Sequence, residues 1–342
     1  MKIPGYNIDL ENAVKTITKN SYKRIVLQIP EGLKNYAFTF VKYLEKETRA
    51  TIIISADPCF GACDLVNYEF KDLDVDFVIQ IGHTPISEID NFCIPTMFIN
   101  AESTLDVTDV IKKAIPYLTG NKIGLVSTSQ HVHIFPRVQE ILVENGFEPI
   151  IGEGDSRIKL KGQILGCNFS AARSIADKVD MFLFIGSGNF HPLGLLLSTK
   201  KPVIIADPYT NQIRDKELSE LKDTILRQRY GAIARSKDAK TFGILIGTKR
   251  GQQRVELAYK IKEILELKQK ISYIITLDNF SSSYLEGFKG IDCFVSTGCP
   301  RIAIDDYMQY KIPIITPVEL DILLGQKKWE DYQFDEILSK NK

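Results

Sequence analysis

Short apolar runs alternate along the chain with polar turns and with stretches that have helical spacing. Three of these runs open longer units that follow the same order of apolar run, polar turn and amphipathic stretch. In the last unit, Val255, Ala258, Ile261 and Leu265 lie on one helical face. The opening strands are predicted at 24–29, 122–126 and 241–246, and the helices that follow them at 34–47, 136–144 and 254–268. The chain therefore contains an internal repeat.

Each opening unit is followed by further apolar runs at similar intervals. The third run of each unit begins with a β-branched residue and an aspartate and ends in glycine, and the fourth carries a proline at its start, where a missing N–H costs least. These later strands are predicted at 51–55, 75–82 and 94–99, at 149–151, 179–186 and 201–206, and at 273–276, 291–298 and 312–316. Continuous apolar strands that alternate with helices are typical of parallel sheets covered on both faces.

The repeat predicts an α/β protein of three related lobes, each a small parallel sheet flanked by helices. The lobes are expected at 1–106, 107–236 and 237–342, a normal size for compact units. A charged segment, 211–235, is expected to be a helical connector that belongs to the second lobe. We expect the lobes to pack around a pseudo-threefold axis with the carboxyl edges of their strands facing inward.

Composition narrows the classes of function. The chain has 342 residues, 44% of them hydrophobic and 25% charged, as in an ordinary globular protein. Its 43 basic and 43 acidic side chains balance, so nothing points to nucleic acid or an anionic membrane as a partner. The N-terminus lacks the apolar stretch of a signal peptide, and no apolar run is long enough to span a membrane. A cytoplasmic protein is expected, in which cysteines act as thiols or metal ligands rather than in disulfides.

Four of the six cysteines lie in loops that follow predicted strands. Cys59 and Cys63 follow the second strand of the first lobe, and Cys167 follows the second strand of the second lobe. Cys299 follows the third strand of the third lobe. If these edges face inward, one thiolate from each lobe can meet at the centre. Three thiolates and one open position suit a [4Fe-4S] cluster whose fourth iron binds a substrate, since soft thiolates select iron–sulfur centres or zinc.

The remaining cysteines and the histidines have simpler interpretations. Cys93 and Cys293 are predicted to be small buried hydrophobes, the first leading into a strand and the second within one. His83 and His191 follow the ends of strands and are expected to face the same cavity, as hydrogen-bonding wall residues rather than catalysts. The Gly/Ser/Thr turns after the opening strands could hold an anion through free N–H groups or simply turn the chain.

A series of short motifs occurs in order along nearly the whole chain. The motifs are Ile29-Pro30-Glu31-Gly32-Leu33, Ala56-Asp57, Phe60-Gly61-Ala62-Cys63, Gly82-His83-Thr84-Pro85, Leu125-Val126-Ser127-Thr128-x-Gln130, Leu165-Gly166-Cys167, Asp207-Pro208-Tyr209, Gly298-Cys299-Pro300-Arg301-Ile302-Ala303-Ile304-Asp305 and Pro317-Val318-Glu319. Any one of them is modest, but the series resembles the diphthamide-biosynthesis 3-amino-3-carboxypropyl transferases. The length, without large extensions, is similar to the archaeal single-gene form of that family, which works as a homodimer.

The resemblance implies a [4Fe-4S] cluster held by Cys63, Cys167 and Cys299, one from each lobe, with S-adenosylmethionine as co-substrate at the open iron. In the family the reduced cluster cleaves the sulfur–Cγ bond, and a 3-amino-3-carboxypropyl radical adds to C2 of a histidine of translation elongation factor two. This is the first step of diphthamide synthesis. Cys59 is an extra thiol beside the family's Gly-Ala-Cys motif, and no catalytic residue beyond the cluster is expected.

The resemblance also implies partners and substrate contacts. The polar residues expected to grip S-adenosylmethionine are Ser127, Thr128, Gln130, Ser187 and Gly188. An electron donor and the elongation factor are the expected partners, with no nucleic acid and no membrane.

Two alternatives remain open from the sequence. The first is a quinolinate synthase, a family that is also built of three lobes with one cluster cysteine each but that uses no S-adenosylmethionine. The order of the motifs fits it poorly. The second is a non-catalytic subunit that only supplies electrons to a homologous partner or acts as its scaffold. The presence of all three cysteine motifs argues against such a subunit.

Overall fold

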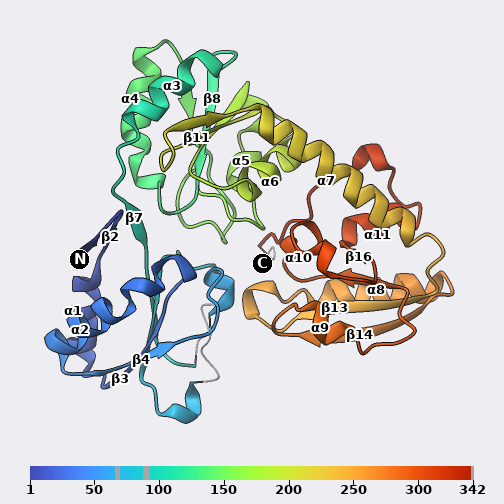
Figure 1. Cartoon of the computed structure of the whole chain (residues 1–342), viewed down its shortest axis with the longest axis horizontal. Coiled ribbons are helices and arrows are strands. Elements are labelled where there is room, and N and C mark those ends of the chain that lie inside the picture. The colour runs from blue at the N-terminus through green and yellow to red at the C-terminus, as the bar shows by residue number, and fades with distance from the viewer. Residues whose placement is uncertain (66–69, 88–92, 340–342) are drawn as a thin grey trace.

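The computed structural model describes residues 1–65, 70–87 and 93–339. It contains three larger sheets, built mainly of parallel strands and flanked by helices, together with a small antiparallel sheet near the N-terminus (Figure 1). The predicted α/β class is therefore confirmed, with three lobes around a common centre in Figure 1. The pseudo-threefold axis and the lobe boundaries at 106 and 236 stay predictions.

The three larger sheets share one strand order, in which the first strand of each lobe lies between the second and the third, and the fourth lies beyond the third. The first sheet contains β3 (Arg24–Gln28), β4 (Thr51–Ser55), β5 (Phe77–Ile81) and β6 (Thr96–Ile99). The second contains β8 (Lys122–Ser127), β9 (Glu148–Ile150), β10 (Met181–Ile185), β11 (Val203–Asp207) and β12 (Gln212–Arg214). The third contains β13 (Thr241–Gly247), β14 (Ile271–Leu277), β15 (Cys293–Ser296) and β16 (Ile314–Ile315).

The aspartate at the second position of each third run has the same role in every lobe. The carboxylates of Asp76, Asp180 and Asp292 each accept hydrogen bonds from two successive backbone N–H groups where the first strand begins, at 2.7–2.9 Å. The carbonyl of the proline before each fourth strand accepts a hydrogen bond from the third strand. The sequence repeat is therefore a repeat of strand junctions, which fix the order of the first, third and fourth strands.

Helices cover the sheets and bury apolar faces against them. Each lobe has apolar clusters of its own, for example Phe40 and Leu44 of α2 packed with the strands of the first sheet, and burial of such side chains contributes roughly 1.5–3 kcal/mol each. The helices are α1 (Leu10–Asn20), α2 (Ala37–Thr48), α3 (Thr108–Ala114), α4 (Phe135–Glu144), α5 (Ser170–Arg173), α6 (Phe190–Thr199), α7 (Lys216–Arg235), α8 (Val255–Leu267), α9 (Ser282–Leu285), α10 (Arg301–Ile304) and α11 (Pro317–Leu323). Among the described residues, none of these is both long and apolar enough to cross a bilayer.

The connector predicted at 211–235 is helical only from Lys216. Its first residues form β12, which pairs antiparallel with β11, because Asn211 adopts a left-handed backbone (φ 54°) that reverses the chain. The helix α7 then reaches the third lobe, where the fully buried Arg229 donates two hydrogen bonds to Glu319 of α11. The predicted connector therefore joins an edge strand of one sheet to the core of the next lobe.

A small antiparallel sheet links the N-terminus to the end of the first lobe. It consists of β1 (Lys2–Ile3), β2 (Tyr6–Ile8) and β7 (Ala101–Ser103). The sequence reasoning did not predict it, because strands of two or three residues carry little periodicity.

Candidate functional site

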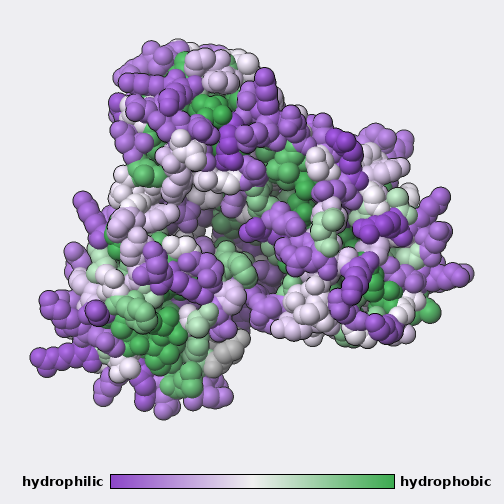
Figure 2. Space-filling model, viewed as in Figure 1, coloured by the Kyte–Doolittle hydropathy of each residue, from purple (hydrophilic) through white to green (hydrophobic). Residues whose placement is uncertain are grey.

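A cavity of about 210 Å³ lies where the three lobes meet, and its walls come from all of them. The three cysteines predicted as ligands, Cys63, Cys167 and Cys299, all line it. Figure 2 shows that the surface is hollowed between the lobes on the face viewed. The structure thus brings together thiols that are more than a hundred residues apart in the sequence.

The loop after β4 presents Cys63 in a single 3₁₀ turn, Ala62–Asp64. The buried Gln28 of β3 donates to the backbone carbonyl of Asp64 at 2.8 Å, and the Asp64 carboxylate accepts from the N–H of Phe60 at 3.1 Å. The same carboxylate forms an ion pair with Lys249 of the third lobe at 2.5 Å. The turn that carries Cys63 is therefore fixed both by its own sheet and by a neighbouring lobe.

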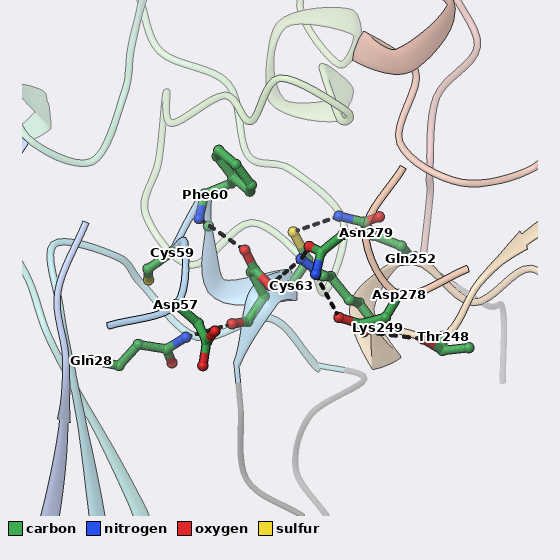
Figure 3. Close-up of polar contacts among 12 residues, drawn as sticks. Gln28, Asp57, Cys59, Phe60, Cys63, Thr248, Lys249, Gln252, Asp278 and Asn279 are labelled. Atoms are coloured by element: carbon green, nitrogen blue, oxygen red, sulfur yellow. Dashed lines mark hydrogen bonds and ion pairs between the residues drawn. The ribbon is translucent and has the colours of Figure 1, made fainter. Parts of the chain in front are cut away.

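The third lobe approaches Cys63 very closely through the turn that precedes α8. A Cβ placed on Gly251 would lie 2.6 Å from the Cβ of Cys63, so glycine is required for this approach. The next residue, Gln252, donates from its side-chain amide to the sulfur of Cys63 at 3.4 Å (Figure 3). From the second lobe, Arg157 donates to the carbonyl of Gly251 at 2.9 Å. All three lobes therefore meet at this point.

Cys167 is held by a C-terminal strap, which we define as residues 332–339. The backbone N–H of Ile337 donates to the carbonyl of Cys167 at 2.7 Å, and the side chain of Asn168 donates to the carbonyl of Ile337 at 3.1 Å. The carboxylate of Glu336 accepts from the N–H of Phe169 at 2.7 Å. The loop of the second lobe is therefore positioned by a segment that follows the third lobe.

The same strap positions Cys299 through Arg254. The guanidinium of Arg254 donates to the carbonyls of Thr297 and Gly298, at 2.7 and 3.2 Å, directly before Cys299. Its two terminal nitrogens, Nη2 and Nη1, also form a two-point ion pair with Asp335 of the strap, at 2.5 and 2.8 Å. One arginine thus joins the loop of Cys299 to the segment that holds the loop of Cys167.

Burial governs the electrostatics of the three thiols. It raises the pKa of Cys63, Cys167 and Cys299, because the charged thiolate is disfavoured away from water. Opposing this, hydrogen bonds from Gln252 and Arg157 lower the pKa of Cys63 and Cys167, respectively. Buried thiols of this kind ionise when a cation binds them, which is the behaviour of metal ligands rather than of exposed nucleophiles.

The donor set fits a cluster better than a single ion. Within residues 1–65, 70–87 and 93–339, no group of three or more His, Cys, Asp or Glu side chains is placed to hold one metal ion. The three thiolates of a [4Fe-4S] cluster bind three different irons, so they surround a volume rather than converge on a point. Three buried thiols with N–H donors, placed around one cavity, meet that requirement. Their role as ligands stays a prediction.

Two histidines line the cavity as neutral side chains. Burial lowers the pKa of His83 and of His191 to about 4, and the ring of His191 stacks on Phe184 at 6.4 Å. Both face the same cavity, as predicted. They add hydrogen-bonding capacity without adding charge at neutral pH.

The residues expected to grip S-adenosylmethionine divide between two cavities. Thr128 and Gln130 line the cavity of the cysteines, and they also line a neighbouring cavity of about 260 Å³ that includes Ser187. Ser127 and Gly188 are not among the described residues that line either one. The hydroxyl of Ser127 is fully buried and donates to the carbonyl of Ile185, and Gly188 accepts from Arg214. These two residues therefore serve local structure, and substrate contact stays a prediction for all five.

Each lobe places a different side chain directly after the glycine that ends its third run. These side chains are His83, Ser187 and Cys299. The first and the last line the cavity of the cysteines, whereas Ser187 lines the neighbouring cavity. Cys63 and Cys167, in contrast, follow second strands. The scaffold repeats, but the three thiols do not all occupy the same position on it.

The other cysteines behave in three ways. Cys59 is buried, and its sulfur lies 3.9 Å from Nδ1 of His83. Burial raises the pKa of the Cys59 thiol to about 12. Cys59 is not among the described residues that line the cavity. Cys293 is fully buried in β15, as predicted. The prediction for Cys93 was wrong, because it lies exposed in a bend before β6. The adjacent Ile94 is buried in its place.

Sequence reasoning missed Arg157, Gln252 and Arg254, which contact the thiols or their loops. Arg254 was interpreted only as the start of a helix, and Gln252 lies in a turn without a recognisable motif. A buried arginine has no local signature in a single sequence. The signal that could have found Gln252 is its place in the polar turn after an opening strand, at an edge expected to face the centre.

Comparison with known proteins agrees with the motifs. Residues 29–333 match the family described as putative diphthamide synthesis protein. A 2-(3-amino-3-carboxypropyl)histidine synthase from Pyrococcus horikoshii is 36% identical over 340 residues, which cover 97% of this chain and 94% of that protein. Another from Methanocaldococcus jannaschii is 31% identical over 350 residues, which cover 97% and 93%.

A solved structure is similar over the same length. The crystal structure of Dph2 from Pyrococcus horikoshii with a 4Fe-4S cluster matches with a TM-score of 0.89 and 34% identity, covering 98% of this chain and 95% of that one. The resemblance drawn from the motifs is confirmed, and the quinolinate synthase alternative is not supported. The chain belongs to the diphthamide synthesis family.

Proposed function

We propose that this chain is a transferase that moves the 3-amino-3-carboxypropyl group of S-adenosylmethionine to C2 of a histidine of translation elongation factor two. This is the first step of diphthamide synthesis. The observation that carries the proposal is that one cysteine from each lobe lines a single cavity. The names of the similar proteins and the cluster in the similar crystal structure support it.

The residues that would hold a [4Fe-4S] cluster are Cys63, Cys167 and Cys299. When bound, such a cluster supplies a single electron to a sulfonium at the iron that no cysteine occupies, which weakens one carbon–sulfur bond. The chain's own residues exclude water and orient the co-substrate, so that the bond to Cγ is the one that breaks. Thr128 and Gln130, at the junction of the two cavities, are the side chains that we assign to orientation.

Two guanidinium groups supply the positive charge that the cavity requires. Arg157 is almost fully buried, and Arg301 stacks over Phe190 at 4.7 Å while donating to Asp305 at 2.8 Å. Both line the cavity. We assign them to the thiolates and to the carboxylate of the co-substrate, because a planar guanidinium matches a carboxylate in two-point contact. The imidazole of His83 is neutral and would leave this balance of positive and negative charge in the cavity unchanged.

The partners that we propose follow from the reaction. The acceptor histidine belongs to another protein, so its side chain has to enter between the lobes, and the hollow in Figure 2 is the expected approach. A one-electron donor is required, and we propose a homodimer as the working form. The cytoplasm, where translation proceeds, is the expected location.

The test is an anaerobic assay of the chain alone. After reconstitution with iron and sulfide, dithionite and S-adenosylmethionine are expected to yield methylthioadenosine, and added elongation factor two is expected to gain the mass of one aminocarboxypropyl group. A bound cluster without methylthioadenosine release would overturn the assignment. Activity that appears only with a second homologous subunit would support the non-catalytic alternative.

A further inference from the structure

We propose that Gln252 sets the reduction potential of the cluster by donating a hydrogen bond to the sulfur of Cys63. The inference rests on the proposed function, because it requires a cluster on that cysteine. Neither the family description nor the names of the similar proteins assign a role to this side chain.

The position of Gln252 is fixed by its surroundings. Its backbone N–H donates to the carbonyl of Lys249 at 2.8 Å, next to the turn Arg250–Gln252, and the residue is only 8% exposed. The turn is held against Cys63 by Arg157, which donates to the carbonyl of Gly251 at 2.9 Å, and Gly251 leaves no gap between the two loops. The amide nitrogen of Gln252 is 3.4 Å from the sulfur of Cys63, and Figure 3 shows the side chain pointing at it. The hydrogen bond is therefore part of a rigid contact between two lobes.

The hydrogen bonds to the three thiols differ in kind. Cys167 receives one from the guanidinium of Arg157, and Cys299 receives one from the backbone N–H of Arg301. The donor to Cys63 is a neutral side chain. Replacing Gln252 with an apolar residue therefore removes a hydrogen bond and leaves the formal charge of the site unchanged. A substitution at Arg157 would change both together, so Gln252 is the position at which the effect can be isolated.

The direction of the effect follows from electrostatics. An N–H directed at a thiolate sulfur stabilises negative charge on it, and the cluster carries one more negative charge after it accepts an electron from a one-electron reductant. The hydrogen bond therefore favours the reduced state and raises the potential. A single buried hydrogen bond shifts such an equilibrium by about tenfold, and tenfold corresponds to about 59 mV for one electron.

The experiment compares the midpoint potential of the reconstituted protein with that of Gln252→Met, by anaerobic redox titration followed by EPR. Methionine is unbranched and of similar length but has no donor. Gln253→Met is the matched control, because the neighbouring glutamine is exposed and donates to the carbonyl of Thr248 instead. We expect a more negative potential in Gln252→Met, with the equilibrium displaced about tenfold, and no change in Gln253→Met.

A second variant and a second measurement separate the possible outcomes. Gln252→Glu keeps the shape and places an acceptor beside the sulfur, so its potential is expected to be at least as negative as that of Gln252→Met. Iron content is measured on every sample. If the unsubstituted protein binds no cluster, the proposed function fails. If both variants at Gln252 bind the cluster with an unchanged or more positive potential, the proposed function stands and this inference is overturned.

Discussion

The ion pair between Arg254 and Asp335 offers the most direct test of how the cavity is held together. Only 13% of the arginine side chain and 6% of the aspartate side chain are exposed. In Asp335→Asn, the guanidinium stays buried and keeps its hydrogen bonds to the loop before Cys299, but it loses its counter-charge. Breaking a buried pair in this way costs about 3 kcal/mol or more. The cost is expected to appear locally, as loosening of the C-terminal strap.

Hydrogen–deuterium exchange followed by mass spectrometry measures that loosening. Since 1.4 kcal/mol corresponds to tenfold, amides protected by the strap are expected to exchange on the order of a hundred times faster. The amide of Ile337, which donates to the carbonyl of Cys167, and that of Ile302, which donates to the carbonyl of Cys299, report on the two loops. Both are expected to respond to the single substitution. The iron bound after reconstitution is expected to fall with them.

The control is Asp331→Asn, the same chemical change at an exposed residue just before the strap. It is expected to leave exchange and iron content unchanged. Unaltered exchange at Ile302 in Asp335→Asn would refute the reasoning, since it would mean that the loop of Cys299 is held without the strap. Faster exchange across the whole chain would also refute it, because a local tether predicts a local response.

Three further predictions test other parts of the structure. Replacing any one of the three cavity cysteines with alanine is expected to lower the iron bound after anaerobic reconstitution. Cys59→Ala and Cys93→Ala are expected to retain the iron. Iron loss in Cys59→Ala, together with iron retained in Cys63→Ala, would make Cys59 the ligand in place of Cys63. Burial lowers the pKa of His131 from 6.5 to about 4, so the stability that its neutral form contributes is present above pH 6.5 and is lost as the pH falls toward 4. In His131→Phe, the free energy of unfolding measured by thermal unfolding is expected to fall by about 3 kcal/mol less over that interval. Parallel pH profiles of the two proteins would contradict this. Glu319→Gln leaves the guanidinium that it pairs with fully buried and unbalanced, so a loss of about 3–5 kcal/mol is expected in urea unfolding of the third lobe, and an unchanged midpoint would count against it.

The parts of the fold that could be predicted are those in which local pattern and tertiary packing agree. Buried parallel strands appear as continuous apolar runs, and the repeated aspartate and proline mark their junctions. The short strand β12 has no such pattern and exists because of the turn at Asn211 and the edge beside it. Cys93 was misplaced because its apolar neighbour, Ile94, is the residue that becomes buried. Propensity and composition do not determine which of two adjacent residues faces inward.

The candidate site could be predicted only as a list of thiols. The reasoning that loops at the carboxyl edges of strands would converge is consistent with the three cysteines that line one cavity, and their role as ligands stays a prediction. The contacts that hold them come from elsewhere in the chain, such as Ile337 against Cys167 and Arg254 against Asp335. Pairs so distant in sequence leave no local signal, and a turn such as that of Gln252 becomes informative only when its neighbour in space is known.

The different side chains after the three third strands bear on how such a protein could have arisen. If the lobes descend from one duplicated unit, this point of the repeat changed after the duplication, because His83, Ser187 and Cys299 now occupy it. A site with the same side chain at all three positions would offer a bound sulfonium three equal orientations. Under the proposed function, the different side chains at these three positions would allow a scaffold of three related sheets to present one substrate bond, and not its neighbours, for cleavage.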